Sequence, residues 1–211
     1  ALGYNAFSLL QTGRDEHGKF MPLIFKSFGD FKPGLYIYFT VLPVKLLGLS
    51  EFSTRLPSAV FGTLSILLIY LLTRKIFNKN IALSSILLFT VNPTMISFSR
   101  ASWESNLNLF ILLLITNLFL KSKYHLVALF SSLTFYAYQG AKLNTPFLLL
   151  FLYFVLKPKL KNIFLPFLCL LMLVMPVLLS LPASSGRLKV FSVFSYTRSP
   201  DYVQNLVSQD S

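Results

Sequence analysis

The sequence predicts an all-α protein built as a multi-pass bundle of transmembrane helices. The chain has 211 residues, of which 55% are hydrophobic and only 12% are charged, whereas soluble domains carry about 25% charged residues. Lysine and arginine stand in small groups between long apolar runs, a pattern typical of membrane proteins. The net charge of +12 does not indicate a nucleic-acid partner, because the basic residues are neither gathered on one amphipathic face nor interleaved with aromatic residues.

Residues 1–55 are predicted to form a first external loop that holds two short helices lying on the membrane surface. In residues 1–11 the apolar side chains of Leu2, Ala6 and Leu9 fall on one helical face, and Gly13 follows as a C-cap. This helix is too short to cross a bilayer, which takes about 20 residues. It therefore belongs at the surface.

A second surface helix is expected over residues 33–50. Pro33 suits a helix start, and the segment is also too short to span. Tyr36 and Tyr38 are placed at the level of the lipid headgroups, where aromatic side chains with a polar tip concentrate.

Six transmembrane spans are predicted in residues 56–182, and residues 183–211 are expected to begin a further external loop. Asn117 lies inside one span and predicts a hydrogen bond between helices. The fourth and fifth spans are short and are also compatible with one broken hairpin. The spans cover residues 56–77, 81–98, 106–120, 125–139, 144–156 and 162–181.

Charge predicts how the spans are oriented. The connectors at residues 74–80, 121–124 and 157–162 hold eight lysines and arginines and no acid, while all seven acids fall on the other side. The positive-inside rule places such connectors in the cytosol. The sequence therefore predicts an integral protein of the plasma membrane whose polar loops and active site face outward.

Polar side chains gather in three outward segments, residues 12–38, 99–105 and 136–146. Lysine and arginine there can hold the phosphate of a lipid, and an acid can deprotonate an acceptor hydroxyl that attacks the adjoining sugar carbon. The candidate catalytic acids are Glu104 and Asp30, the candidate phosphate-binding residues are Lys32, Arg100 and Lys142, and the candidate acceptor-binding or loop residues are Asp15, Glu16 and Tyr138.

Each candidate also has a structural interpretation. Asp15 and Glu16, next to Gly13, are compatible with a simple turn. Glu104 suits the N-terminus of a helix, and Arg100 is compatible with a membrane-flanking position. The sequence shows no ligand spacing for a metal ion, although it leaves a divalent cation open.

The same segments resemble a known family. The run TGRDEHGKFMPLIFKSFGDFKPGLYIY at residues 12–38, and the segment that follows it to residue 77, are similar to the first external loop and second span of GT-C membrane glycosyltransferases. The resemblance is to glycosyltransferase family 39, which contains the protein O-mannosyltransferases and the aminoarabinose-transferase-like enzymes. Residues 48–58 and 29–33 are the most specific parts of this resemblance.

The resemblance implies a GT-C fold and a sugar donor linked to polyprenyl or dolichyl phosphate, with transfer to a protein or glycolipid acceptor on the extracytoplasmic face. No further cofactor is implied. Lys32 matches a family lysine that contacts the donor phosphate, and Glu104 matches an acid of the second external loop. The family's main catalytic carboxylate, in an Asp-Glu pair, would precede Ala1, so the chain is expected to be a piece of a longer protein.

Two other functions are compatible with the sequence. A transporter or flippase for a lipid-linked saccharide would also need many spans and outward polar groups, and it predicts helix-breaking or ionisable residues near the middle of the bilayer. A non-catalytic subunit of a membrane complex is the other alternative. An Asp-Glu pair encoded ahead of Ala1 would favour the enzyme.

Overall fold

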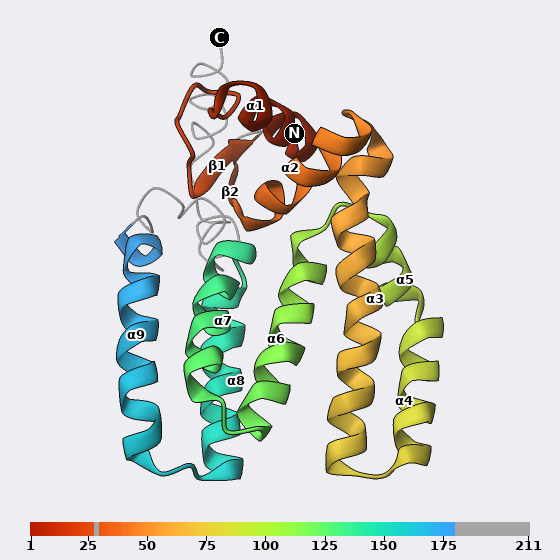
Figure 1. The fold of residues 1–211 in the computed structure, drawn as a ribbon, viewed down its shortest axis with the longest axis vertical. Coiled ribbons are helices and arrows are strands. Elements are labelled where there is room, and N and C mark those ends of the chain that lie inside the picture. The colour runs from red at the N-terminus through yellow and green to blue at the C-terminus, as the bar shows by residue number, and fades with distance from the viewer. Residues whose placement is uncertain (28–29, 180–211) are drawn as a thin grey trace, which may run out of the picture.

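The computed structural model describes residues 1–27 and 30–179, and these form a cap set on one end of a helical bundle (Figure 1). The elements of the cap are α1 (Leu2–Thr12), β1 (Ile24–Ser27), β2 (Asp30–Pro33) and α2 (Leu35–Leu47). The bundle comprises α3 (Glu51–Ile76), α4 (Lys79–Val91), α5 (Pro93–Arg100), α6 (Glu104–Leu120), α7 (Tyr124–Ala137), α8 (Ala141–Leu156) and α9 (Leu160–Leu179).

The first predicted helix forms, whereas its place at the membrane surface stays a prediction. α1 ends at Gly13, which adopts a left-handed conformation (φ 68°) and donates its backbone N–H to the carbonyl of Leu9. Ala6 and Leu9 are buried together in a small apolar core of the cap, to which Phe25 of β1 also belongs. The apolar face of α1 is therefore covered by the cap itself.

Two strands, residues 24–27 and 30–33, form where the sequence predicted only a loop, and this pair of strands is called the hairpin. β1 and β2 pair in antiparallel fashion, with Phe25 opposite Lys32 and Ile24 opposite Pro33. The hairpin forms because Phe25 is fully buried in the core of the cap, so the strand carries one anchoring side chain. The all-α prediction holds for most of the described chain and is wrong for this segment.

The second surface helix starts two residues later than predicted, since Pro33 ends β2 and α2 begins at Leu35. The depth of Tyr36 at the headgroup level stays a prediction, but its side chain is enclosed by protein. Tyr36 is fully buried and packs with Leu107 in the main core of the bundle. Burial is tolerated because its hydroxyl donates to the carbonyl of Thr54 at 3.0 Å.

The bundle helices stand side by side, and the turns α3–α4, α6–α7 and α8–α9 all lie at the end away from the cap (Figure 1). These turns correspond to the three basic connectors of the sequence, so their lysines and arginines share one end of the bundle. Lys75 near the end of α3 donates to the carbonyl of Leu120, the last residue of α6, which ties two helix ends together there. Which side of a membrane this end occupies stays a prediction.

The second predicted span, residues 81–98, is broken into α4 and α5, whose axes are bent by 58°. Pro93 lacks the N–H that would continue the helical ladder. Asn92 instead caps α5, because its side-chain oxygen accepts the backbone N–H groups of Thr94 at 2.9 Å and Met95 at 3.3 Å. The continuous span expected from hydropathy is wrong at this point.

In the described part of the chain, α3 alone is long and apolar enough to cross a bilayer as one helix, and α4 with α5 passes the same test as a bent pair. α6, α8 and α9 are shorter apolar helices. The number of spans therefore stays a prediction. The external loop expected at residues 183–211, and the last residues of the sixth expected span, lie outside the described residues.

Candidate functional site

The first two outward segments meet through an ion pair. The ammonium group of Lys32 on β2 lies 4.0 Å from the Oε1 of Glu104, and the two side chains are 28% and 11% exposed. Glu104 is the first residue of α6 and so stands at the positive end of that helix, where a carboxylate is favoured. The sequence did not predict the hairpin that positions Lys32. The hairpin brings Lys32 of the first segment to Glu104 of the second segment.

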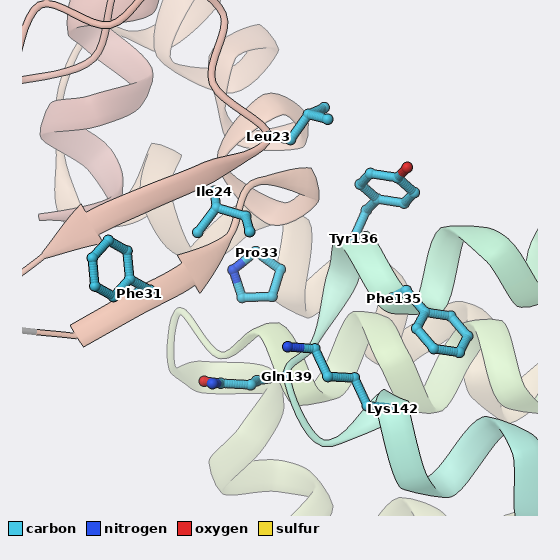
Figure 2. Close-up of a pocket in the computed structure, with 8 residues that line it drawn as sticks. All are labelled: Leu23, Ile24, Phe31, Pro33, Phe135, Tyr136, Gln139 and Lys142. Atoms are coloured by element: carbon cyan, nitrogen blue, oxygen red, sulfur yellow. The ribbon is translucent and has the colours of Figure 1, made fainter. Parts of the chain in front are cut away.

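The third segment meets the hairpin at a small crevice, which Figure 2 shows in close-up. Phe31 and Pro33 of β2 face Gln139 and Lys142 from the region where α7 ends and α8 begins. The Lys142 side chain extends from α8 with its ammonium group directed toward Pro33 and Gln139 (Figure 2). With about 10 Å³ of internal space, the crevice has room for a single water molecule.

Lys32 does not line this crevice, although its neighbours Phe31 and Pro33 do. Successive side chains of a strand point to opposite faces. The alternation along β2 therefore places Lys32 on the face opposite to Phe31 and Pro33, where it pairs with Glu104. Lys32 and Lys142, the two predicted phosphate-binding lysines, therefore lie on opposite faces of β2 and do not line one cavity.

Tyr36 adjoins the ion pair and was missed as part of the site. Its burial raises the pKa of the phenol to about 12, and the negative charge of Glu104 acts in the same direction. The only signal in the sequence is the spacing of Tyr36, Thr40 and Val44, which puts three buried side chains on one face of α2.

A large apolar groove of about 900 Å³ runs between α7, α8 and α9. Lys142 lines it at the end near the cap, and Lys161 lines it at the far end, near the start of α9. Its walls are otherwise almost entirely apolar, and Lys142 is the residue that the groove shares with the crevice. The sequence did not reveal this groove, since hydropathy cannot separate an apolar groove from an apolar contact. Small residues at Ala128 and Ser131 and the helix-internal Pro146 and Pro166 were the available signals.

Asp15 and Glu16 hold the loop of the cap together. The Oδ1 of Asp15 accepts the backbone N–H groups of His17 at 3.0 Å and Lys19 at 2.8 Å. Asn5 of α1 donates its side-chain amide to the Oε1 of Glu16 at 3.0 Å and accepts the backbone N–H of Glu16 at 3.2 Å. These contacts fit the turn interpretation, and an acceptor-binding role for the two acids stays a prediction.

The remaining candidates occupy separate places. Arg100 is the exposed last residue of α5. Tyr138 caps the C-terminus of α7, and its ring leaves no room for a Cβ at Gly140. Asp30 begins β2 opposite Ser27. In the ranges 1–27 and 30–179, no three His, Cys, Asp or Glu residues are grouped to hold a metal ion.

The site therefore combines cations and a carboxylate near the cap with an apolar groove along the bundle. The profile of the dolichyl-phosphate-mannose-protein mannosyltransferase family matches residues 32–182, more than two thirds of the chain. The chain belongs to this family and is a membrane glycosyltransferase. No curated protein and no solved structure matches it. Of the candidates, Lys32, Arg100, Glu104, Tyr138 and Lys142 lie inside the matched range, whereas Asp15, Glu16 and Asp30 precede it.

Proposed function

We propose that the protein transfers a sugar from a polyprenyl- or dolichyl-phosphate donor to a hydroxyl of a protein or glycolipid acceptor, on the outer face of the membrane. One observation carries the proposal. Lys142 lines both the crevice beneath the hairpin and the apolar groove along the bundle. A ligand with a long apolar chain and an anionic end matches this arrangement.

The chain of such a donor fits the groove because both are apolar and lie at the depth of the hydrocarbon core. Each CH₂ group removed from water contributes about 0.8 kcal/mol, but within a bilayer this gain is already present, so the groove selects by shape rather than by hydrophobicity. The phosphate group at the end of the lipid chain then lies at Lys142, whose compact ammonium group binds it as a point charge.

Transfer at this position needs a cation to stabilise the departing phosphate and an acid to accept a proton. The acceptor oxygen forms a bond to the anomeric carbon as the bond from that carbon to the phosphate oxygen breaks, and the acceptor proton passes to a carboxylate. Lys142 and Lys32 are the proposed cations, with Arg100 as a further candidate. Glu104 and Asp30 are the candidate acids of this chain.

The orientation of the protein is also part of the proposal. Eight basic residues fall in the connectors that lie at the end of the bundle opposite the cap. The positive-inside rule would put this end in the cytosol and the Lys32–Glu104 pair outside, in a multi-pass protein of the plasma membrane.

The test is a transfer assay with the intact protein in proteoliposomes and a radiolabelled polyprenyl-phosphate mannose as donor. We expect labelled acceptor to form and expect Lys32→Ala and Glu104→Gln each to reduce the rate at least tenfold, since Lys32→Ala removes a cation proposed to stabilise the departing phosphate and Glu104→Gln removes a candidate proton acceptor. Near-normal rates in both variants would contradict the assignment. Binding of the donor without any transfer would favour the non-catalytic subunit.

One observation favours transport of a lipid-linked saccharide as a second candidate. The break between α4 and α5 at Asn92 and Pro93 is the kind of helix interruption that transporters place in the membrane. The groove, however, is lined from α6 to α9 and receives no residue of α4 or α5. Movement of labelled donor between leaflets in the absence of acceptor would support this second function.

A further inference from the structure

Lys32 is paired with Glu104 in this structure, and the proposed transfer reaction requires Lys32 to leave this pair. In this structure the ammonium group of Lys32 is held on the Glu104 side of β2, whereas Lys142 and the end of the groove lie on the other side. A phosphate at the end of the groove would therefore find Lys32 held by Glu104.

We propose that Glu104 is a positioning residue, which holds Lys32 by an ion pair in the donor-free protein and surrenders it to the donor phosphate. The inference rests on the proposed function and deepens it, because it assigns to one carboxylate the control of the phosphate-binding lysine. When the phosphate leaves with its lipid, Glu104 recaptures Lys32 and thereby helps to release the product.

The lysine, and not the carboxylate, is the partner able to move. Glu104 is only 11% exposed and is fixed at the first turn of α6, while Lys32 is 28% exposed and reaches it through a flexible four-carbon side chain. At 4.0 Å the pair is long for a charge-assisted hydrogen bond. Exchange for the donor phosphate, a diester that offers one negative charge and two free oxygens as the carboxylate does, therefore costs little.

Tyr36 gives the carboxylate a rigid support. Its ring is fully buried under α6, and its hydroxyl is committed to the carbonyl of Thr54 at 3.0 Å. Tyr36 therefore packs beside the Lys32–Glu104 pair, and its hydroxyl does not compete with Glu104 for Lys32.

The inference predicts that Glu104 weakens binding of the lipid phosphate through Lys32. Binding of undecaprenyl phosphate is measured with the intact wild-type protein in nanodiscs, with Glu104→Gln, with Lys32→Ala and with the double variant. We expect Glu104→Gln to bind about two- to fivefold more tightly, the range that a partly exposed ion pair supplies. Lys32→Ala should bind about tenfold more weakly.

The double variant separates control through Lys32 from simple repulsion. If Glu104 acts through Lys32, adding Glu104→Gln to the Lys32→Ala variant changes the affinity for undecaprenyl phosphate by less than about 1.5-fold. If the carboxylate only repels the phosphate, the same tightening persists without Lys32, and the proposal is overturned. An unchanged or weaker affinity of Glu104→Gln also overturns it.

Turnover supplies an independent measurement. In Glu104→Gln we expect both kcat and the KM for the donor to fall, because the freed lysine retains the product phosphate. Glu51→Gln is the matched control, since Glu51 is paired with Arg55 at 3.1 Å at the start of α3, away from Lys32, and its loss changes the net charge equally. It should leave both constants unchanged. Absence of undecaprenyl phosphate binding by the wild-type protein would instead refute the proposed function, and the inference with it.

Discussion

The side-chain amide of Asn106 donates to the backbone carbonyl of Ser58 at 2.7 Å and thereby joins α6 to α3. Both residues are buried, and the hydroxyl of Ser58 donates in turn to the carbonyl of Phe98 on α5. This polar contact lies within one turn of Glu104 along α6. It therefore fixes the helix that carries the carboxylate of the candidate site.

We expect Asn106→Ala to lower the free energy of unfolding by about 1 kcal/mol, the usual value of a hydrogen bond between membrane helices. Gly62→Ala should cost about 1–3 kcal/mol by overpacking, because a Cβ there would clash with the Oγ of Ser99. Thermal unfolding in detergent measures both. Ser84→Ala is the control, as Ser84 is exposed and bonds only within α4. Equal stability of all the variants would contradict a structural role for this contact.

Local rules predicted the features that depend on few residues. Gly13 was predicted to cap α1, and the structure shows its left-handed conformation. Asn117 was predicted to bond between helices, and it donates to the carbonyl of Leu68 at 3.1 Å. Both rest on nearest-neighbour chemistry, a backbone conformation that favours glycine and a polar amide that needs a partner in an apolar setting.

The features that hydropathy missed depend on contacts between distant segments. Phe25 stabilises a hairpin only because α1 and α2 cover it, and Tyr36 is buried only because α6 and the start of α3 close over it. The hydropathy of a segment is the same whether its side chains face lipid or protein. The sequence could therefore place outward segments together by topology, but it could not decide which face of β2 would carry Lys32.

Tyr36 makes stability sensitive to alkaline pH. Its pKa in the folded protein, about 12, lies above the ordinary tyrosine value of 10.0, so the unfolded chain releases the proton first. Its contribution to stability is complete below the unfolded value and is lost as the pH rises from there toward the folded value. We expect the wild-type midpoint of thermal unfolding to fall more steeply than that of Tyr36→Phe between about pH 10 and 12. Parallel curves would show that Tyr36 does not titrate differently in the two states.

The two lysines of the groove test which end receives the phosphate. Lys142 lines the end near the cap and Lys161 the end near the basic connectors, so each is the matched control for the other. We expect Lys142→Ala to weaken undecaprenyl phosphate binding about tenfold and Lys161→Ala to leave it nearly unchanged. The reverse result would move the phosphate to the opposite end of the groove and contradict the proposed outward site.

The groove itself is tested by the length of the lipid. Ala128 is 5% exposed and lines the groove from α7, so Ala128→Phe narrows it at a point remote from Lys142. We expect this variant to lose about tenfold in affinity for undecaprenyl phosphate, as the added ring displaces lipid contacts, and to bind the short farnesyl phosphate almost as the wild-type protein does. The measurement is the ratio of the two affinities in nanodiscs. A general loss of folding would weaken both ligands alike, and an unchanged ratio would show that the lipid chain lies elsewhere.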